Sequence, residues 1–158
     1  MPVTSQLEQF LTVETPTLLT NLSEETAPKW GIMTAQHMVE HLAGTMRLSN
    51  GKRAVNRITP IEQLESRRNF LFGPQPFQKN IKPNPGPAVL QELKLINLDA
   101  AKIALLNEIQ DFLTYFEGHD GLKPMNPIYG ELTKQEWIIF HQKHFKHHFT
   151  QFGLLVTE

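Results

Sequence analysis

The chain contains no cysteine among its 158 residues. Disulfide bonds, thiolate metal ligands and a cysteine nucleophile are therefore excluded. No apolar run approaches the roughly 20 residues that a membrane-spanning helix needs. The N-terminal stretch MPVTSQLEQFL also lacks the basic region and apolar core of a signal peptide. We therefore expect a cytoplasmic protein that does not insert into a membrane.

Charge of either sign is not in excess, because 15 basic and 16 acidic side chains leave a net charge of −1. A surface that binds nucleic acid needs a clear excess of lysine and arginine, so we expect no nucleic-acid partner. Residues 52–82 are a local exception, with seven lysines and arginines against two glutamates. This segment is either a solvated surface or a rim that attracts anions. The expected partner is a small-molecule substrate, and association into a homodimer is left open.

Histidine is the residue type whose distribution is most informative. Six of the seven histidines form two groups, one early and one near the C-terminus: His37 and His41, then His141, His144, His147 and His148. On a helix, His144 and His148 would lie one turn apart and about 40° apart around the axis. The same stripe carries Trp137, Phe140, Gln151 and Leu155. A stripe with large apolar residues faces the core, so the two imidazoles are expected to point inward and to need partners.

A third imidazole is available on an earlier helix. Thr34 is a suitable N-cap, and His41 shares a helix face with apolar residues such as Met38 and Leu48. Packed against the C-terminal helix, His41 could complete a site of three neutral nitrogen ligands. Without thiolates, such a site does not select zinc over nickel or iron. The alternative is a surface or core cluster of histidines that binds no metal.

Five further polar residues lie near the three proposed ligands in the sequence. We expect them around the site, as hydrogen-bond partners or substrate contacts: His37, His141, His147, Gln151 and Tyr129. Packing or simple exposure is the alternative role for each.

Helical spacing of apolar residues and helix caps recur along the chain, and no stretch shows sustained strand alternation. The expected helices are 34–49, 61–71, 98–116 and 134–152, with Pro16 interrupting a first helical region. Residues 73–87, GPQPFQKNIKPNPGP, hold five prolines and cannot form a regular helix. The fold class expected is all-α, an antiparallel four-helix bundle with a long Pro-rich crossover.

The run HFKHHFTQFG, together with EHL in the earlier helix, resembles the DinB-like metal-binding helical superfamily. The segments WGIMTAQHMVEHL, PIYGELTKQEW and KHFKHHFTQFG are similar to an uncharacterised branch of it. This resemblance implies one DinB-like helical domain over residues 1–158. It also implies that His41, His144 and His148 hold a divalent metal.

Known activities in that superfamily include transferases that use low-molecular-weight thiols and a thiol-dependent isomerase. The resemblance therefore implies a metal-dependent enzyme that activates an external thiol for transfer to an electrophilic small molecule, or else water for hydrolysis. Because the chain has no cysteine, any thiol must come from a cofactor. The alternative is a metal-anchored small-molecule binding protein without turnover, since the histidines are the only evident general bases.

Overall fold

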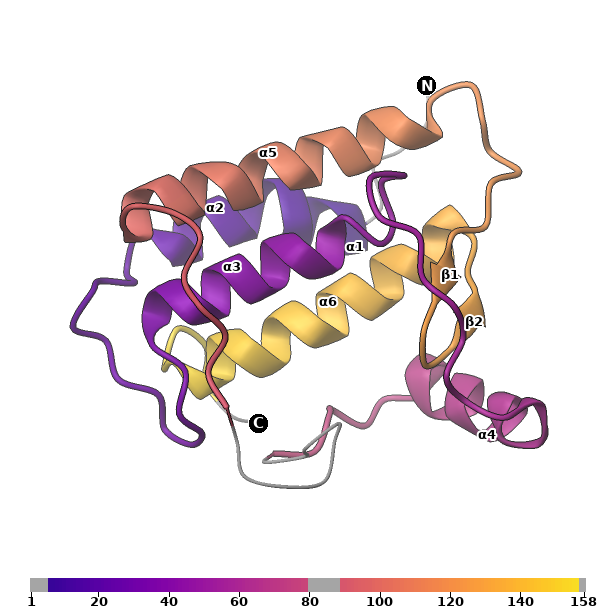
Figure 1. Cartoon of the computed structure of the whole chain (residues 1–158), viewed down its shortest axis with the longest axis horizontal. Helices are drawn as coiled ribbons and strands as arrows, with labels where there is room; N and C mark the ends of the chain where they lie inside the picture. Colours follow the sequence, from indigo (N-terminus) through magenta and orange to yellow (C-terminus); the bar gives the residue numbers. More distant parts are fainter. Residues whose placement is uncertain (1–5, 80–88, 157–158) are drawn as a thin grey trace.

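The protein is helical. The computed structural model describes residues 6–79 and 89–156 (Figure 1). Within them lie five helical segments and one short hairpin: a continuous first segment made of α1 (Gln6–Gln9), a π-helical turn (Phe10–Glu14) and α2 (Thr15–Leu19), then α3 (Ala35–Met46), α4 (Ile61–Phe72), α5 (Leu98–Phe116), β1 (Met125–Asn126), β2 (Gly130–Glu131) and α6 (Lys134–Gln151). Among the described residues, no helix combines the length and the apolar character needed to cross a membrane.

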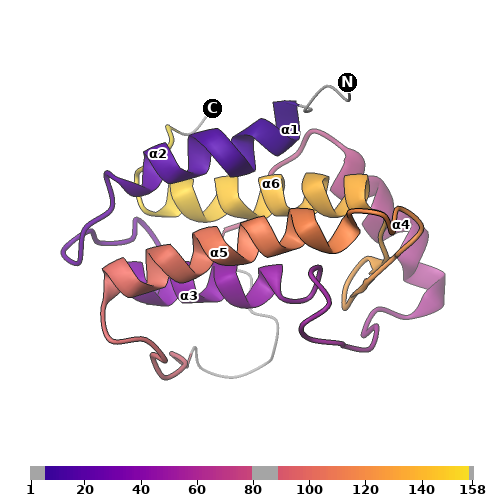
Figure 2. The same ribbon diagram turned by 90° about the horizontal axis from the view of Figure 1, so that it is seen from above.

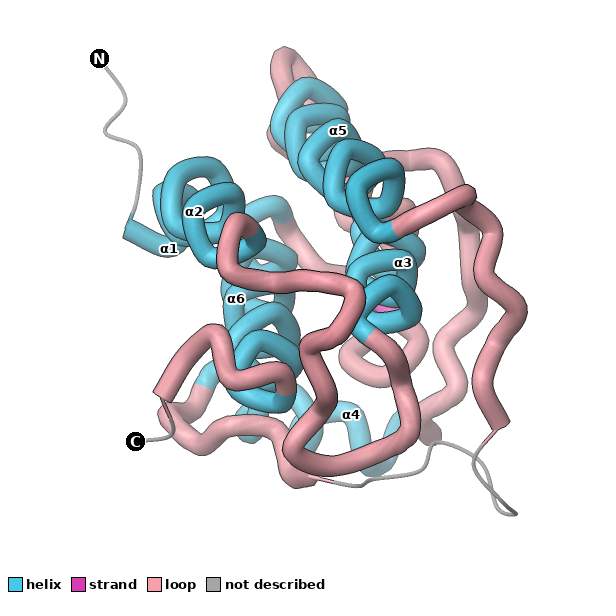
Figure 3. Tube along the Cα trace, turned by 90° about the vertical axis from the view of Figure 1, so that its left-hand side faces the viewer, coloured by secondary structure: helices cyan, strands magenta, loops and turns pink. Residues whose placement is uncertain are grey.

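Four of the helical segments lie side by side with their axes roughly aligned, and seen end-on they take neighbouring positions (Figures 2 and 3). The first segment and α6 run in one direction, whereas α3 and α5 both run in the other (Figure 1). The fifth segment, α4, lies apart beside the hairpin. The expected antiparallel bundle of four helices thus describes the arrangement only in part, because the neighbours α3 and α5 are parallel.

The parallel pair follows from the long connection between α3 and α5, which returns the chain to the end of the molecule where α3 began. This connection contains α4 and the Pro-rich segment expected to be a crossover. Residues 73–79 have neither helix nor strand, as their prolines predict. Residues 80–87 of that segment lie outside the described residues.

Pro16 does not divide the first helical segment. A proline lacks an N–H group, so the carbonyl one turn earlier loses its usual donor. The chain widens into a π turn instead, in which the Thr15 N–H donates to the Phe10 carbonyl. The Thr15 hydroxyl donates to the same oxygen at 2.9 Å. The segment therefore continues, and it buries Phe10 and Leu11 in the core.

The last helix begins at a capping box, for which the S/T-x-x-E pattern of Thr133 and Glu136 is the signal in the sequence. The Thr133 hydroxyl accepts from the Glu136 N–H at 3.2 Å, and the Glu136 carboxylate accepts from the Thr133 N–H at 3.0 Å. The buried face of α6 then carries Trp137, Phe145 and Phe149. This start fixes the register in which the later histidines of the helix face the core.

Two long-range contacts hold the α4–α5 connection near α6 and α3. The Lys143 ammonium donates to three backbone oxygens, those of Phe70, Gly73 and Gln75, at 2.6 to 3.1 Å. On the other side, the Glu40 carboxylate accepts from the N–H groups of Lys94 and Leu95. One described stretch of the connection is thus anchored to α6, which carries His144 and His148. The other is anchored to α3, which carries His41.

Candidate metal centre

His41 from α3 and His144 and His148 from α6 meet between the two helices. The Nε2 atoms of His41 and His144 are 3.0 Å apart, and those of His144 and His148 are 3.1 Å apart. The three ring centroids form a nearly regular triangle, with separations of 4.9, 4.9 and 4.8 Å and steeply inclined planes. One ligand nitrogen from each ring lies within 4.8 Å of the others, so the three histidines could hold a metal ion.

Gln151 fixes the tautomer of His148. The Gln151 side-chain amide donates to the Trp30 carbonyl at 2.9 Å, which turns its oxygen toward His148 Nδ1 at 2.7 Å. An amide oxygen only accepts, so Nδ1 carries the proton and donates it. The Nε2 atom of His148 is then left with a free lone pair that faces the other two histidines. This is the usual way in which a metal-binding imidazole is oriented.

Burial keeps the imidazoles neutral. Desolvation lowers the pKa of His148 to about 3, and it lowers the pKa of His144 well below its usual value, with further lowering by the neighbouring histidines. Desolvation also lowers the pKa of His41, and the charge of His147 lowers it further. His144 and His148 are each 8% exposed, whereas part of the His41 side chain is open to solvent. Access to the cluster is therefore on the side of His41.

The site fits a cation better than it fits three histidines alone. His144 has no hydrogen-bond partner for its buried Nδ1 in the described structure, with or without an ion at Nε2, so the fit depends on Nε2 alone. Its Nε2 faces two other ring nitrogens, and a single N–H there could be directed at only one of them. A divalent ion held about 2.1 Å from each ligand nitrogen would bring those nitrogens to about 3 to 3.5 Å from each other. Two of the separations already have this value.

Aromatic rings line the side of the cluster next to α6. Phe140 stacks on His144 at 5.4 Å between centroids, and Phe77 meets the same ring edge-on at 6.2 Å. Trp30 packs against His147 at 5.5 Å. Phe77 and Trp30 were not expected from the sequence, because both are brought here by the long-range contacts of Lys143 and Gln151. Apolar walls of this kind strengthen electrostatic interactions at the cluster by excluding water.

The remaining expected site residues have other contacts. The half-buried His37 ring is 2.6 Å from the Thr34 hydroxyl, at the capping box of α3. Tyr129 is buried against Phe140, which separates it from His144. His147 packs edge-on against His148 and hydrogen-bonds the backbone of Phe77. Of the five, Gln151 is the residue with a direct hydrogen bond to the triad.

His141 is a core residue. Its side chain is fully buried, and its ring stacks on Trp137 at 5.2 Å and meets Phe112 edge-on at 5.3 Å. Its Nε2 lies 2.7 Å from the Ser49 hydroxyl, which donates to the Met46 carbonyl. Nε2–H therefore donates to Ser49, and the buried Nδ1 has no partner in the described structure. Burial lowers the pKa of His141 to about 3.

No carboxylate joins the histidine cluster within the described residues. The nearest in sequence, Glu40, accepts from the side chain of Gln36 as well as from the two backbone N–H groups of the α4–α5 connection. Its pKa is lowered by these hydrogen bonds, which outweigh the opposing effect of desolvation. Glu40 is therefore a structural anchor, and the ligand set of the cluster is uncharged.

A sequence model of a family described as a protein of unknown function (DUF1569) matches residues 85–153. The matched part contains α5 and α6, and with them His144, His148 and Gln151. It begins after α3 and therefore does not include His41. The similarity thus covers less than half of the chain. No curated protein and no solved structure gives a significant match to it.

The hydrogen bond from His148 to Gln151 leads to a first prediction. In Gln151→Leu, the affinity for a divalent cation should fall roughly 10- to 100-fold, because His148 loses the acceptor that fixes its tautomer. Titration of metal-stripped protein with Zn²⁺ or Ni²⁺ measures the change. Gln142→Leu, on the same helix but outside the cluster, is the matched control and should bind as the unaltered chain does. Equal affinity in both variants would contradict this role of Gln151.

Proposed function

We propose that the chain is a metal-dependent enzyme in which His41, His144 and His148 bind one divalent cation, zinc, nickel or iron. The reaction proposed is activation of an external low-molecular-weight thiol, or of water, for attack on an electrophilic small molecule. Enzymes of this kind are transferases or hydrolases. The observation that carries the proposal is the convergence of three neutral imidazoles, with Nε2 atoms 3.0 and 3.1 Å apart, at a point open to solvent on one side.

A cation held by three neutral ligands would keep its full positive charge and could lower the pKa of a thiol or a water molecule toward neutrality. The side chains of the chain itself would prepare the site. Gln151 holds His148 in the required tautomer, and Phe140 keeps the ring of His144 in place by stacking. Because the protein supplies no cysteine, the thiol would have to enter from solution.

The family assignment is also part of the proposal. A DinB-like domain is supported by the histidine pattern, with one imidazole from an early helix and two from the last. Related folds host many activities, so the family supports this chemistry by analogy.

A non-catalytic role is favoured by one specific observation. Glu40, the carboxylate next to His41, is fully engaged by Gln36, Lys94 and Leu95, and it is not available as a general base. In this second candidate, the metal anchors a small ligand without turnover. The two candidates share the metal site and differ in whether product forms.

The test compares metal-loaded protein, metal-stripped protein and His148→Ala with a panel of thiols and electrophiles. The panel pairs cysteine and glutathione with an aryl halide and an epoxide, and includes an activated ester for hydrolysis. We expect product only with the loaded, unaltered chain, at a rate at least about 100-fold above the other two samples. Stoichiometric metal without turnover in any pairing would instead support the binding protein. Equal turnover in all three samples would reject a metal-dependent reaction.

A further inference from the structure

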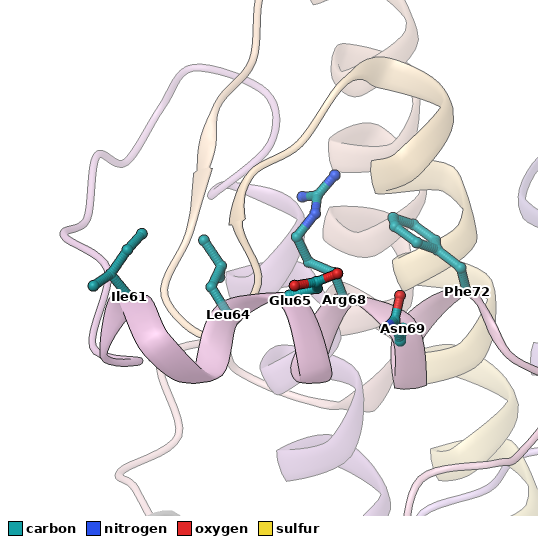
Figure 4. Close-up of a pocket in the computed structure, with 6 residues that line it drawn as sticks. All are labelled: Ile61, Leu64, Glu65, Arg68, Asn69 and Phe72. Atoms are coloured by element: carbon teal, nitrogen blue, oxygen red, sulfur yellow. The ribbon is translucent and has the colours of Figure 1, made fainter.

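Helix α4 presents an apolar surface to solvent. In the described structure, Ile61 is 65% exposed and Phe72 is 42% exposed, and Leu71 is the one fully buried residue of the helix. Between them lies a shallow hollow of about 360 Å³, lined by α4 residues alone: Ile61, Leu64, Glu65, Arg68, Asn69 and Phe72 (Figure 4). Two large apolar side chains are thus open to solvent, one near each end of α4.

Three exposed residues of α4 and the half-buried Arg68 form one stripe. At 100° per residue, Ile61, Glu65, Arg68 and Phe72 fall within about 60° around the helix axis. The apolar members occupy the two ends of the helix, and the two opposite charges lie between them (Figure 4). From end to end the stripe therefore has the order apolar, acidic, basic, apolar.

This order is complementary to itself when reversed. If two copies of α4 pack antiparallel about a twofold axis between residues 66 and 67, Ile61 of one copy meets Phe72 of the other. In the same register, Glu65 of one copy meets Arg68 of the other. We propose that this stripe binds a second copy of the same chain, through an isologous interface centred on α4.

The charged groups at the centre keep part of their hydrogen-bonding capacity for this contact. Arg68 is held in place by the carbonyls of Tyr129 and Glu131, both bound by Nη1, and by Glu136, bound by Nη2. A guanidinium has five N–H groups, so its Nε–H and one Nη2–H have no partner in the part of the chain that the structure describes. Glu65 is exposed and forms no ion pair there. In the dimer, the Glu65 carboxylate of each copy would meet the Arg68 guanidinium of the other, which gives two ion pairs.

The expected interface is small. A single pair of 12-residue helices buries less than the roughly 800 Å² per partner of a standard protein interface, so the dimer should form only at raised concentration. Its apolar contacts lie at the ends of the pair and its ion pairs at the centre. Dimerisation should thus depend on Ile61 and Phe72 individually.

The first experiment measures molar mass by light scattering or sedimentation over a concentration series. The unaltered chain should rise from 18.1 kDa toward twice that mass. Ile61→Lys and Phe72→Glu should each remain monomeric, whereas an equimolar mixture of the two should dimerise, because one lysine then faces one glutamate and the other end keeps its native contact. Ile103→Lys, at a 62% exposed isoleucine on α5, is the matched control and should dimerise like the unaltered chain.

A second experiment keeps the surface nearly apolar and uses the absence of native cysteine. Ile61→Cys and Phe72→Cys each introduce a single thiol. Under mild oxidation, a mixture of the two should form a disulfide-linked dimer several times faster than either variant alone, because residues 61 and 72 meet only in the antiparallel register. An unaltered chain that stays monomeric at every concentration would overturn the proposal. So would a dimer that both charged variants retain, or equal cross-linking in mixed and single samples.

Discussion

Replacing His144 by alanine is expected to reduce bound metal from about one ion per chain to background. His144 is the shared member of the triad, with its Nε2 3.0 Å from that of His41 and 3.1 Å from that of His148. Without His144, the remaining ligand nitrogens are one from His41 on α3 and one from His148 on α6, and the pair of ligands on α6 is lost. Elemental analysis of protein purified without chelator, loaded and then dialysed, gives the metal content directly.

Two further variants make this test decisive. His119→Ala removes an exposed imidazole from the turn after α5 and should keep full metal content. His41→Ala removes the exposed member of the triad, so it leaves no large cavity, and it should lose metal as His144→Ala does. Circular dichroism confirms that each variant is still helical. If His144→Ala or His41→Ala bound as much metal as His119→Ala, the triad would not be the metal site.

Local sequence signals predicted the helices that carry the site. The Thr133–Glu136 capping box and the start of α6 are where the sequence indicates, and α5 has the predicted bounds, Leu98–Phe116. These features depend on residues within a few positions of each other. For the same reason the spacing of His144 and His148 already predicted that both rings share one face of a helix.

Features that depend on distant partners could not be predicted in this way. The parallel direction of α3 and α5 follows from the path of the connection, which Lys143 and Glu40 anchor through backbone groups more than 50 residues away. Phe77 reaches His144 for the same reason. The hairpin of two-residue strands is too short for any alternation to show, although Asn126 and Gly130 are typical turn residues.

His37 and His141 illustrate a second limit. Both lie near the triad in sequence, and composition alone cannot separate a ligand from a cap or a core residue. The structure separates them by their partners, Thr34 at a helix start and Ser49 in the core. Gln151, by contrast, lies one turn beyond His148 on the same face, and that spacing was sufficient to suggest its hydrogen bond.

The buried His141 should make the metal-free protein sensitive to acid. Burial lowers its pKa in the folded state to about 3, from an ordinary value of 6.5. Its ring contacts only uncharged groups in the described structure: the aromatic rings of Phe112, Trp137, Phe140 and Phe145, and the Ser49 hydroxyl. Between these two pH values, the unfolded chain binds a proton at this histidine that the folded chain does not. Stability is thus fully present above pH 6.5 and is lost as pH falls toward 3.

The magnitude of this loss is about 1.4 kcal/mol per pH unit for each such histidine. In His141→Phe, an aromatic ring fills the same apolar surroundings without a titratable group. The free energy of unfolding in urea, measured with chelator present at several pH values from about 7 to about 4, should therefore fall less steeply in this variant by that amount. A slope remains, because burial also lowers the pKa values of His144 and His148. His119→Phe, at an exposed position, should keep the slope of the unaltered chain. The same slope in His141→Phe as in the unaltered chain would show that His141 is protonated as readily in the fold as in the unfolded chain.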